Sequence, residues 1–381
     1  MANTITRTQT KLLHVLNNLN YSGAEVMLYD AYDFFEEKGF EQHILCNGTA
    51  LGPYKQVLEE KGYIIHFIPA TKSIGFLVDM YQFFRSNKFD VVHIHPEMLY
   101  FWKCISTKLA NPNLKIVRTY HDVFDKYSSI QKKSREYQRM ICNKYFGVTG
   151  VSIGESVHKI EKEMLKNDTA IVYNWIDETK FRPPLPEEIV KARAEFGIAP
   201  DAFVVLTVGT CNDKKCHNDI FEAVKRVKDQ IPNIVFLHRG SGPNAEQEKR
   251  YVEELGIAEN VKFLGYIEDL PKVFWAADAF IFSSKWEGLG DVIIEAIACK
   301  LPVILYSGHG MNDFKPAAEK DTYGYWLNHK TERFDEAILD VYKKKQDGTI
   351  TDWKEKAFQY FQNKFSRSNS LHKLLNIYLN N

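Results

Sequence analysis

The stretch SSKWEGLGDVIIEAIACKLPVIL (Ser283–Leu305) places a glycine-containing loop between the end of a strand and the start of a helix. The apolar run AFIFSS leads into it, Glu287 and Gly290 stand in the loop, and Glu295 lies in the following helix. Glycine after a strand lets the backbone approach a ligand with free N–H groups, and a helix N-terminus favours phosphate. Since carboxylates accept hydrogen bonds from hydroxyls, Glu287 and Glu295 are expected to bind different parts of one extended ligand, such as a sugar and a ribose.

The rest of the C-terminal half repeats this alternation of short apolar runs and helical patterns. The expected strands are FVVLTVG, NIVFLHRG, VKFLGY, AFIFSS and PVILYS, and the expected helices lie near 217–230, 244–255, 268–276 and 291–299. The N-terminal half offers the runs KLLHVLNNL, QHILC, YIIHFIP, DVVHIH, KIVRTYH, GVTGVS and TAIVYN. This alternation predicts two α/β domains, each with a mostly parallel, doubly wound sheet.

The proline-rich segment RPPLPEE, around residue 182, interrupts the alternation and predicts a stiff linker. We therefore expect an N-terminal, acceptor-side Rossmann-like domain over residues 1–185 and a C-terminal, donor-binding one over 186–365. The helical pattern SLHKLLNIYL predicts a last helix within 366–381, which we expect to pack back on the N-terminal domain. Ligands of open α/β sheets bind beyond the carboxyl ends of the strands, so a cleft between the domains is the expected site.

Composition narrows the class of protein further. The 381 residues include 49 Lys and Arg against 49 Asp and Glu, a balance that argues against nucleic-acid binding. No stretch approaches the roughly 18 apolar residues that span a bilayer, and the polar start MANTITRTQT lacks the apolar core of a signal peptide. The six cysteines are dispersed without a CxxC pair, which is typical of reduced thiols. We expect a cytoplasmic protein.

The Glu287 stretch resembles the Glu–seven residues–Glu motif of the retaining, nucleotide-sugar-dependent glycosyltransferases of family 4 (glycosyl transferases group 1). Further pieces resemble that family in its order along the chain: LLHVLNNLNYSGAE its first strand and glycine loop, VYNWIDETKFRP its segment before the linker, and VGTCNDKKCHNDIFEA its phosphate-binding strand and loop. The resemblance implies the GT-B fold, an α/β architecture of two Rossmann-like doubly wound domains facing a central cleft.

By matched position, the resemblance implies catalytic roles for two residues. Glu287 would contact hydroxyls of the donor sugar near the reacting carbon, and His121, at the end of the fifth strand, would lie beside that sugar. Gly23 would let the first loop approach the diphosphate of the donor.

The same resemblance implies the remaining donor-binding residues. Glu295 would bind the ribose, Lys215 would neutralise the leaving diphosphate, and Gly209 would open the phosphate-binding loop. Backbone N–H groups around Gly290, Asp291 and Val292 would meet the sugar or the diphosphate.

The chain departs from the family pattern at three places near these residues. Thr210 stands where the family usually has a phosphate-binding Arg, and Arg239 could supply the missing charge. Ser22 replaces the first of two glycines, which is a mild change if its φ stays negative. After PVIL, the sequence YSGHGMNDF replaces the small-residue turn that the family commonly has.

The resemblance implies transfer of a hexose-type sugar from a nucleoside diphosphate donor, with uridine as the default base, to an acceptor hydroxyl. The acceptor would belong to a cell-surface polysaccharide or a lipid-linked oligosaccharide. No metal or other cofactor is expected, because lysine and backbone N–H groups would carry the leaving diphosphate and no Asp-x-Asp motif follows a strand.

The sequence leaves other functions open. A nucleotide-sugar epimerase would use a similar fold and need no acceptor, and a non-catalytic protein would keep only the pocket. A retaining glycosidase needs two carboxyls about 5–5.5 Å apart, which a loop residue and a helix residue do not favour. A nicotinamide dehydrogenase is disfavoured because neither first strand is followed by GxGxxG.

Two groups of side chains could bind a metal. His93 and His95 alternate on one strand, but hydrogen-bonded packing is the more common role of such histidines. Cys211, Cys216 and His217 lie close in sequence, but they lack a fourth ligand and a regular spacing.

One segment is markedly basic. Residues 101–145 hold ten Lys and Arg against three acidic residues, with aromatic residues among them. Such a face could contact anionic lipid at the inner side of the cytoplasmic membrane, although an ordinary solvated surface explains it as well.

Overall fold

The computed structural model describes residues 9–71, 73–121, 128–267 and 269–380. The chain divides into two compact units, one of Met1–Asn174 with Ser368–Asn381 and one of Trp175–Arg367. The first boundary thus lies at 174/175, before the proline-rich segment, instead of within it at 185/186, and the second lies at 367/368 instead of 365/366.

The segment before the prolines belongs to the C-terminal unit because it packs there. Trp175 is buried, and the ring of Phe181 packs on the ring of Phe274 at 5.8 Å between centroids. The indole nitrogen of Trp275 donates a hydrogen bond to the carbonyl of Arg182 (3.2 Å). The expected linker is therefore a packed part of the second unit.

The prolines start a helix that the sequence pattern did not predict. Helix α7 (Pro186–Glu195) has proline at its first position, where the missing N–H costs no hydrogen bond. The Glu188 carboxylate accepts a hydrogen bond from the backbone N–H of Leu185 (2.7 Å) and bonds Arg182 (2.7 Å and 2.8 Å). These contacts fix the helix start.

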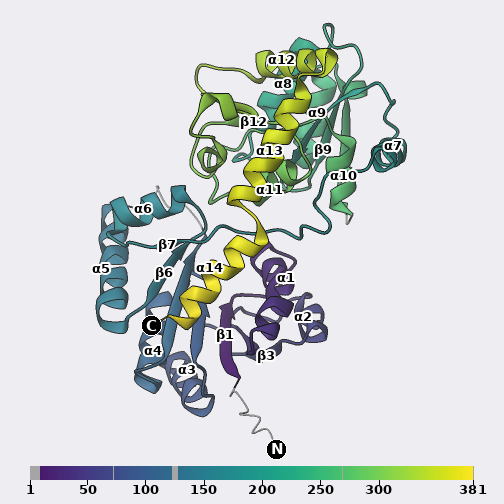
Figure 1. Cartoon of the computed structure of the whole chain (residues 1–381). Helices are drawn as coiled ribbons and strands as arrows, with labels where there is room; N and C mark the ends of the chain where they lie inside the picture. Colours follow the sequence, from purple (N-terminus) through teal and green to yellow (C-terminus); the bar gives the residue numbers. More distant parts are fainter. Residues whose placement is uncertain (1–8, 72, 122–127, 268, 381) are drawn as a thin grey trace, which may run out of the picture. The chain divides into compact units, whose positions relative to one another are not determined.

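The N-terminal unit contains a parallel sheet in the order β3-β2-β1-β4-β5-β6-β7 (Figure 1). Its strands are β1 (Thr10–Leu16), β2 (Phe40–Cys46), β3 (Ile64–Phe67), β4 (Val91–Ile94), β5 (Lys115–Tyr120), β6 (Thr149–Ser152) and β7 (Ala170–Ile171). Each falls within one of the expected apolar runs or overlaps it, and the inner strands β1 and β4 are buried on both faces over most of their length, unlike the edge strand β3.

Helices cover both faces of this sheet. They are α1 (Gly23–Glu37), α2 (Lys55–Lys61), α3 (Ile74–Ser86), α4 (Tyr100–Ala110), α5 (Ser129–Phe146) and α6 (Glu155–Leu165). One apolar core joins Leu13 and Val15 of β1 to Met80 and Cys104 on α3 and α4. The core on the other face joins β1 and β2 to α1 and α2.

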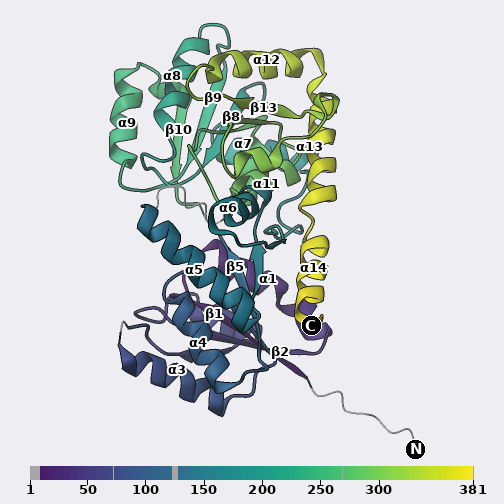
Figure 2. The ribbon, with the colours of Figure 1, turned by 90° about the vertical axis from the view of Figure 1, so that its left-hand side faces the viewer.

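The last helix, α14 (Arg367–Leu379), packs on the same unit, beside α1 (Figures 1 and 2). The stripe expected to be apolar and buried is buried: Leu371, Leu374, Leu375 and Tyr378. The Tyr378 ring lies 5.4 Å from the Phe35 ring of α1.

The C-terminal unit contains a second parallel sheet in the order β10-β9-β8-β11-β12-β13. Its strands are β8 (Phe203–Val208), β9 (Ile234–Arg239), β10 (Val261–Gly265), β11 (Ala279–Phe282), β12 (Val303–Tyr306) and β13 (Gly324–Leu327). The sequence pattern predicted the first five and missed β13, whose run GYWL is short, starts with glycine and is only partly buried.

The helices of this unit lie at the expected places. Besides α7 they are α8 (His217–Val227), α9 (Ala245–Glu254), α10 (Leu270–Ala276), α11 (Asp291–Ala298), α12 (Phe334–Asp347) and α13 (Ile350–Lys364). Apolar residues of α8, α9 and α12 form one core with β8 and β9, while α11 packs against α13. In the part of the chain that the structure describes, no helix combines the length and apolar character needed to cross a membrane.

Candidate active site

Each sheet has one point where the chain reverses its direction of winding. In the C-terminal unit the chain runs from β8 outward to β10 and returns to β11 on the other side of β8. In the N-terminal unit the same reversal lies between β1 and β4. Ligands of open α/β sheets bind beyond the carboxyl ends of the strands at such points. The loops that follow β8 and β11 carry the residues expected to bind the donor.

Glu287 lies between two lysines in the C-terminal unit. Its Oε1 accepts from Lys215 Nζ at 2.7 Å, and its Oε2 accepts from Lys214 Nζ at 2.8 Å. The hydroxyl of Ser284, which is buried at the end of β11, donates to Oε1 at 2.5 Å. The structure thus joins Glu287 to the predicted Lys215 and to Lys214.

The charges of Glu287 and Lys215 affect the pKa of each other. Burial raises the pKa of Glu287, but Lys215, Lys214 and Ser284 outweigh burial and lower it overall. Burial lowers the pKa of Lys215, and the attraction of Glu287 opposes that effect. One carboxylate and two ammonium groups leave a net positive charge, which suits an anionic ligand.

Backbone contacts hold the loop of Glu287 in place. The N–H of Lys285 donates to the carbonyl of Lys214 (3.1 Å), and the N–H of Glu287 donates to the carbonyl of His309 (3.0 Å). A Cβ at Gly310 would lie 2.7 Å from the carbonyl oxygen of Glu287, so a side chain there would displace this loop. Three loops, after β8, β11 and β12, therefore fix one carboxylate.

Two of the predicted glycines have a local physical reason. Gly290, at the N-terminus of α11, has a φ of 88°, a conformation that other residues rarely adopt. At Gly209, a Cβ would lie 3.3 Å from the Cε of Lys215, so glycine leaves room for the lysine stem. Asp291 and Val292, both half-buried, follow Gly290 in the first turn of α11.

Glu295 lies one turn further along α11, half-buried in a different environment. Burial, with a smaller effect of Asp291, raises its pKa to about 8, and Arg239 opposes this rise. Its Oε2 is buried and has no hydrogen-bond partner among the described residues. A buried acceptor of this kind is available to a hydroxyl of a ligand.

Arg239 ends β9, near Glu295. Its Nη2 donates to the carbonyl of Ile267 (3.0 Å), and its guanidinium lies 4.8 Å from the ring centre of Tyr266. Burial lowers its pKa, while Tyr266 and Glu295 act in the opposite direction. Arg239 thus lies on the Glu295 side of the donor-binding group.

In the N-terminal unit, the residues expected from the resemblance lie around a pocket of about 400 Å³. His121 and His95 line it together with residues of the loop after β1. Gly23 is the first residue of α1, and Ser22 before it has a φ of −132°, so the substitution of glycine there requires no strained backbone. The hydroxyl of Ser22 donates to Glu25, a buried carboxylate that also lines the pocket.

His121 is uncharged at neutral pH. Burial, with a smaller effect of Arg118, lowers its pKa to about 3. Its Nε2 lies 3.2 Å from Nδ1 of His95, so one of the two nitrogens donates to the other. A neutral imidazole at the pocket wall can exchange hydrogen bonds with sugar hydroxyls but does not supply a positive charge.

The structure favours the packing role of His93. Its Nδ1 lies 2.6 Å from the hydroxyl of Tyr378, and its Nε2 lies 2.6 Å from the hydroxyl of Thr119. Both ring nitrogens of His93 thus have hydroxyl partners, although ligand-type atoms of His14, His93 and His95 lie within 4.8 Å of one another.

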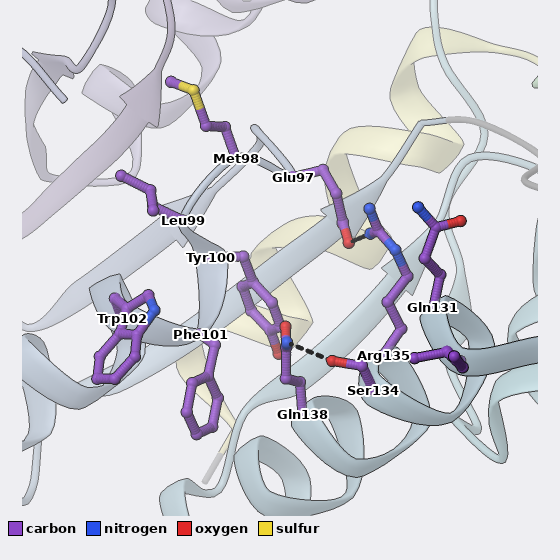
Figure 3. A pocket seen from close by; sticks show the side chains of 11 residues that line it. Glu97, Met98, Leu99, Tyr100, Phe101, Trp102, Gln131, Ser134, Arg135 and Gln138 are labelled. Carbon is purple, nitrogen blue, oxygen red and sulfur yellow. Dashed lines mark hydrogen bonds and ion pairs between the residues drawn. The ribbon is translucent and has the colours of Figure 1, made fainter. Parts of the chain in front are cut away.

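A second pocket of the N-terminal unit, of about 790 Å³, lies between the starts of α4 and α5 (Figure 3). Trp102, Phe101 and Ile130 give it an apolar lining, and Glu97 bonds Arg135 at its edge. Glu97 also pairs with the buried Arg118 (2.8 Å).

Sequence reasoning assigned a role to only one of the two adjacent lysines, Lys214 and Lys215, and it missed Ser284 and Glu25. Lys214 adjoins the predicted lysine, and both backbone N–H groups reach the Asn212 side chain (3.1 Å and 3.3 Å), a turn that directs both amines to one place. That local turn signal could have identified the pair. Ser284 and Glu25 have no comparable signal, because their roles depend on side-chain contacts.

Two doubly wound α/β domains with charged residues at the winding reversals are typical of the GT-B fold. A family model described as Glycosyl transferases group 1 matches residues 188–360, and one described as Glycosyltransferase Family 4 matches residues 21–180. Together they match most of the chain, which therefore belongs to the group 1 glycosyltransferases and is an enzyme of the transferase class.

Individual proteins agree with this assignment. The chain is 24% identical over 327 residues to the UDP-Gal:alpha-D-GlcNAc-diphosphoundecaprenol alpha-1,3-galactosyltransferase of Escherichia coli, covering 81% of this chain and 82% of that one. Among solved structures, a glycosyltransferase of Rickettsia africae ESF-5 matches with a TM-score of 0.83 and 19% identity, over 97% of this chain and 98% of that one. Anabaena Alr3699/HepE in complex with UDP matches with a TM-score of 0.80 and 18% identity, over 96% and 98%.

Proposed function

We propose that this enzyme is a retaining glycosyltransferase that moves a hexose-type sugar from a UDP-sugar to an acceptor hydroxyl. The observation that carries the proposal is the Glu287 carboxylate held between Lys214 and Lys215 at the carboxyl ends of β8 and β11. The names of the relatives support it, since the Escherichia coli protein is a UDP-Gal-dependent transferase and the Anabaena protein was solved with UDP.

The two lysines suit the charge that develops during transfer. When the bond between the sugar and the diphosphate breaks, negative charge grows on the departing phosphate oxygen. Lys214 and Lys215, already directed to one place by Glu287, stabilise that charge without rearranging. Glu287 accepts hydrogen bonds from the sugar hydroxyls, and the departing phosphate oxygen takes the proton of the acceptor hydroxyl on the same face of the sugar. No step of this proposal requires a metal.

Glu295 and Arg239 would bind the nucleotide end. Ribose hydroxyls can donate to the buried Oε2 of Glu295, which lacks a partner. Arg239 would supply the phosphate charge missing at Thr210, and the N–H groups around Gly290, Asp291 and Val292 would meet the diphosphate or the sugar. In the N-terminal unit, we assign Gly23 to the approach of the first loop to the diphosphate and His121 to hydrogen bonds with the donor sugar.

The acceptor we propose is a saccharide of a cell-surface polysaccharide or of a lipid-linked oligosaccharide. The Escherichia coli relative acts on an undecaprenol-linked sugar by its name. An epimerase remains the second candidate on chemical grounds alone, since Glu287 and Glu295 would bind the same donor without an acceptor.

A panel of nucleotide sugars tests the donor assignment by thermal shift. A ligand that binds only the folded chain raises the melting temperature, and at about 100 times its Kd it stabilises the fold by about 2.7 kcal/mol. We expect UDP-hexoses to raise the melting temperature more than GDP- or ADP-hexoses do. No shift with any nucleotide sugar would contradict the proposal, and an isomerised sugar formed from donor alone would indicate the epimerase instead.

Arg239→Ala in the same assay tests the phosphate role of Arg239. We expect a weaker shift with the UDP-sugar at equal concentration, because the variant loses one phosphate contact. If the shift is unchanged, Arg239 does not replace the arginine missing at Thr210.

Fewer basic side chains of the segment 101–145 lie on the surface than its composition suggested. Lys103, Arg118 and Arg139 are buried, and Arg139 pairs with the buried Glu161 (2.6 Å), so these three do not belong to a solvent face. Residues 122–127 of the segment lie outside the described residues.

A stripe of exposed apolar and basic side chains nevertheless remains on α5. Ile130 (81% exposed), Tyr137 (62% exposed) and Met140 share it with the exposed Lys133 and Lys144 at helical spacing. Apolar and aromatic side chains flanked by lysines are typical of helices that lie on anionic lipid. We propose that this stripe holds the enzyme at the inner face of the cytoplasmic membrane.

Charge reversal on the stripe tests the proposal. Each lysine near an anionic surface contributes about 1 kcal/mol, so replacing both Lys133 and Lys144 by Glu should weaken binding to phosphatidylserine-containing liposomes by at least about 30-fold. The matched control reverses Lys225 and Lys343, two exposed lysines of the C-terminal unit. Binding that is insensitive to salt, or lost equally in both variants, would contradict the stripe.

A further inference from the structure

Four buried side chains converge behind the loop that carries the two lysines. Cys211 follows β8, His217 starts α8, His238 lies in β9 and Glu248 lies in α9. All four residues are at most 4% exposed, and one ligand-type atom from each lies within 4.8 Å of the other three. The sequence suggested Cys211, Cys216 and His217 as possible metal ligands. In the structure, Cys211 and His217 are joined by His238 and Glu248, which are distant in sequence, and Cys216 is not part of the group.

Distances within the group are short. His217 Nδ1 lies 2.9 Å from Glu248 Oε1 and 3.0 Å from His238 Nε2. His238 Nε2 in turn lies 3.3 Å from Glu248 Oε2. A tetrahedral zinc ion, with ligands at about 2.0–2.3 Å, separates its ligand atoms by about 3.3–3.6 Å. The cluster is therefore close to the size that such an ion requires.

Hydrogen bonds already join these side chains. His217 Nδ1 can donate to Glu248 Oε1 (2.9 Å), and His238 Nε2 can donate to Glu248 Oε2 (3.3 Å). His238 Nδ1 is buried and has no partner among the described residues whichever ring nitrogen carries the proton. A zinc ion would take the place of the protons between these ligand atoms.

We propose that Cys211, His217, His238 and Glu248 form a structural zinc site. One thiolate, two imidazoles and one carboxylate are ligands that zinc accepts, and four protein ligands without access to solvent are typical of structural sites and not of catalytic ones. The positive charge of the ion would lie between the ligand atoms of these four side chains.

The site would fix the segment that positions the lysines. Cys211 and His217 stand on either side of Lys214 and Lys215 in the sequence. The N–H of Cys211 donates to the carbonyl of Ser241, and the N–H of Asn244 donates to the carbonyl of Cys211 (3.0 Å and 3.1 Å), so the loop after β8 is already joined to the loop after β9. Zinc would add bonds that tie the loop after β8 and strand β9 to α8 and α9. This role is independent of the sugar donor and of the proposed transfer reaction.

The test measures metal binding by the full chain directly. Purified protein is treated with a chelator, exchanged into metal-free buffer and titrated with Zn²⁺, and bound zinc is measured by mass spectrometry of the elements. We expect about one zinc per chain and a melting temperature that rises with zinc. Titration with Co²⁺ should give the absorption of a tetrahedral ion and a thiolate-to-cobalt charge-transfer band.

Substitution of single cysteines tests whether Cys211 binds the zinc ion. Loss of even an outer-shell partner lowers metal affinity about 10- to 100-fold, so Cys211→Ser should lower zinc affinity by at least that much and remove the charge-transfer band. Cys216→Ser is the matched control, because Cys216 is half-buried and its thiol donates to the carbonyls of Asp213 and Lys214 (3.4 Å and 3.8 Å) outside the group of four.

Three results would overturn the site: no zinc retained by the titrated wild-type chain, equal loss of zinc in Cys211→Ser and Cys216→Ser, or a cobalt spectrum of the wild type without a thiolate band. The wild-type spectrum needs no variant, so the proposal stays testable even if Cys211→Ser does not fold.

Discussion

Glu287→Gln lowers kcat/KM for sugar transfer by about 100- to 1,000-fold, the range that loss of one preorganised electrostatic group typically costs. The substitution keeps the volume of the side chain but removes the charge that directs Lys214 and Lys215 to one place (2.8 Å and 2.7 Å). Without that charge, two half-buried ammonium groups repel each other and lose their fixed position. Most of the loss is expected in kcat, measured with saturating UDP-sugar and acceptor.

Glu259→Gln is the matched control for this substitution. Glu259 is exposed in the short 3-10 helix of the same unit, Ala258–Asn260, and should keep wild-type activity. Melting curves of both variants separate lost activity from lost folding. Activity of Glu287→Gln within about threefold of wild type would exclude the role given to Glu287, because a change that small is under 1 kcal/mol of transition-state stabilisation.

Much of the fold could be predicted from the sequence because parallel strands buried on both faces appear as short continuous apolar runs. FVVLTV is an example, with all six residues of β8 buried. The prediction of secondary structure failed where residues that usually break a helix instead begin one. Three prolines near residue 184 read as a linker, but one of them occupies the first position of α7, where proline is favoured.

The candidate site was predictable only where a short motif carries it. Glu287, Gly290 and Glu295 lie within one strand–loop–helix segment, so their spacing indicates a common ligand. Lys214 shares its role with the predicted Lys215 through a local turn, which the residue types alone do not reveal.

Only two of the four proposed zinc ligands, Cys211 and His217, lie close enough in sequence to suggest a shared site. Cys211, His217, His238 and Glu248 come from four separate elements. No regular spacing in the sequence connects them, so only the packing of β8 and β9 against α8 and α9 brings them together.

Glu295 should make the ligand-free enzyme less stable as pH rises, and Glu295→Gln should remove that loss. Burial raises the pKa of Glu295 from its ordinary 4.5 to about 8. Between these values the folded chain holds a proton that the unfolded chain has released, so stability falls by about 1.4 kcal/mol per pH unit until the pH nears 8. From pH 6 to pH 8 the wild type should therefore lose about 2 kcal/mol more than the variant, measured by urea unfolding at both pH values.

Binding of the donor should show the opposite dependence on pH. Ribose hydroxyls donate to the ionised carboxylate and favour it, so UDP-glucose should bind the wild type more tightly at pH 8 than at pH 6 and release a proton on binding. Glu295→Gln should bind it weakly and with little change between these pH values. If the variant binds UDP-glucose as tightly as the wild type at pH 8, Glu295 does not contact the ribose. If instead stability and affinity respond to the substitution as expected, the buried carboxylate that destabilises the free enzyme is the one that the nucleotide requires.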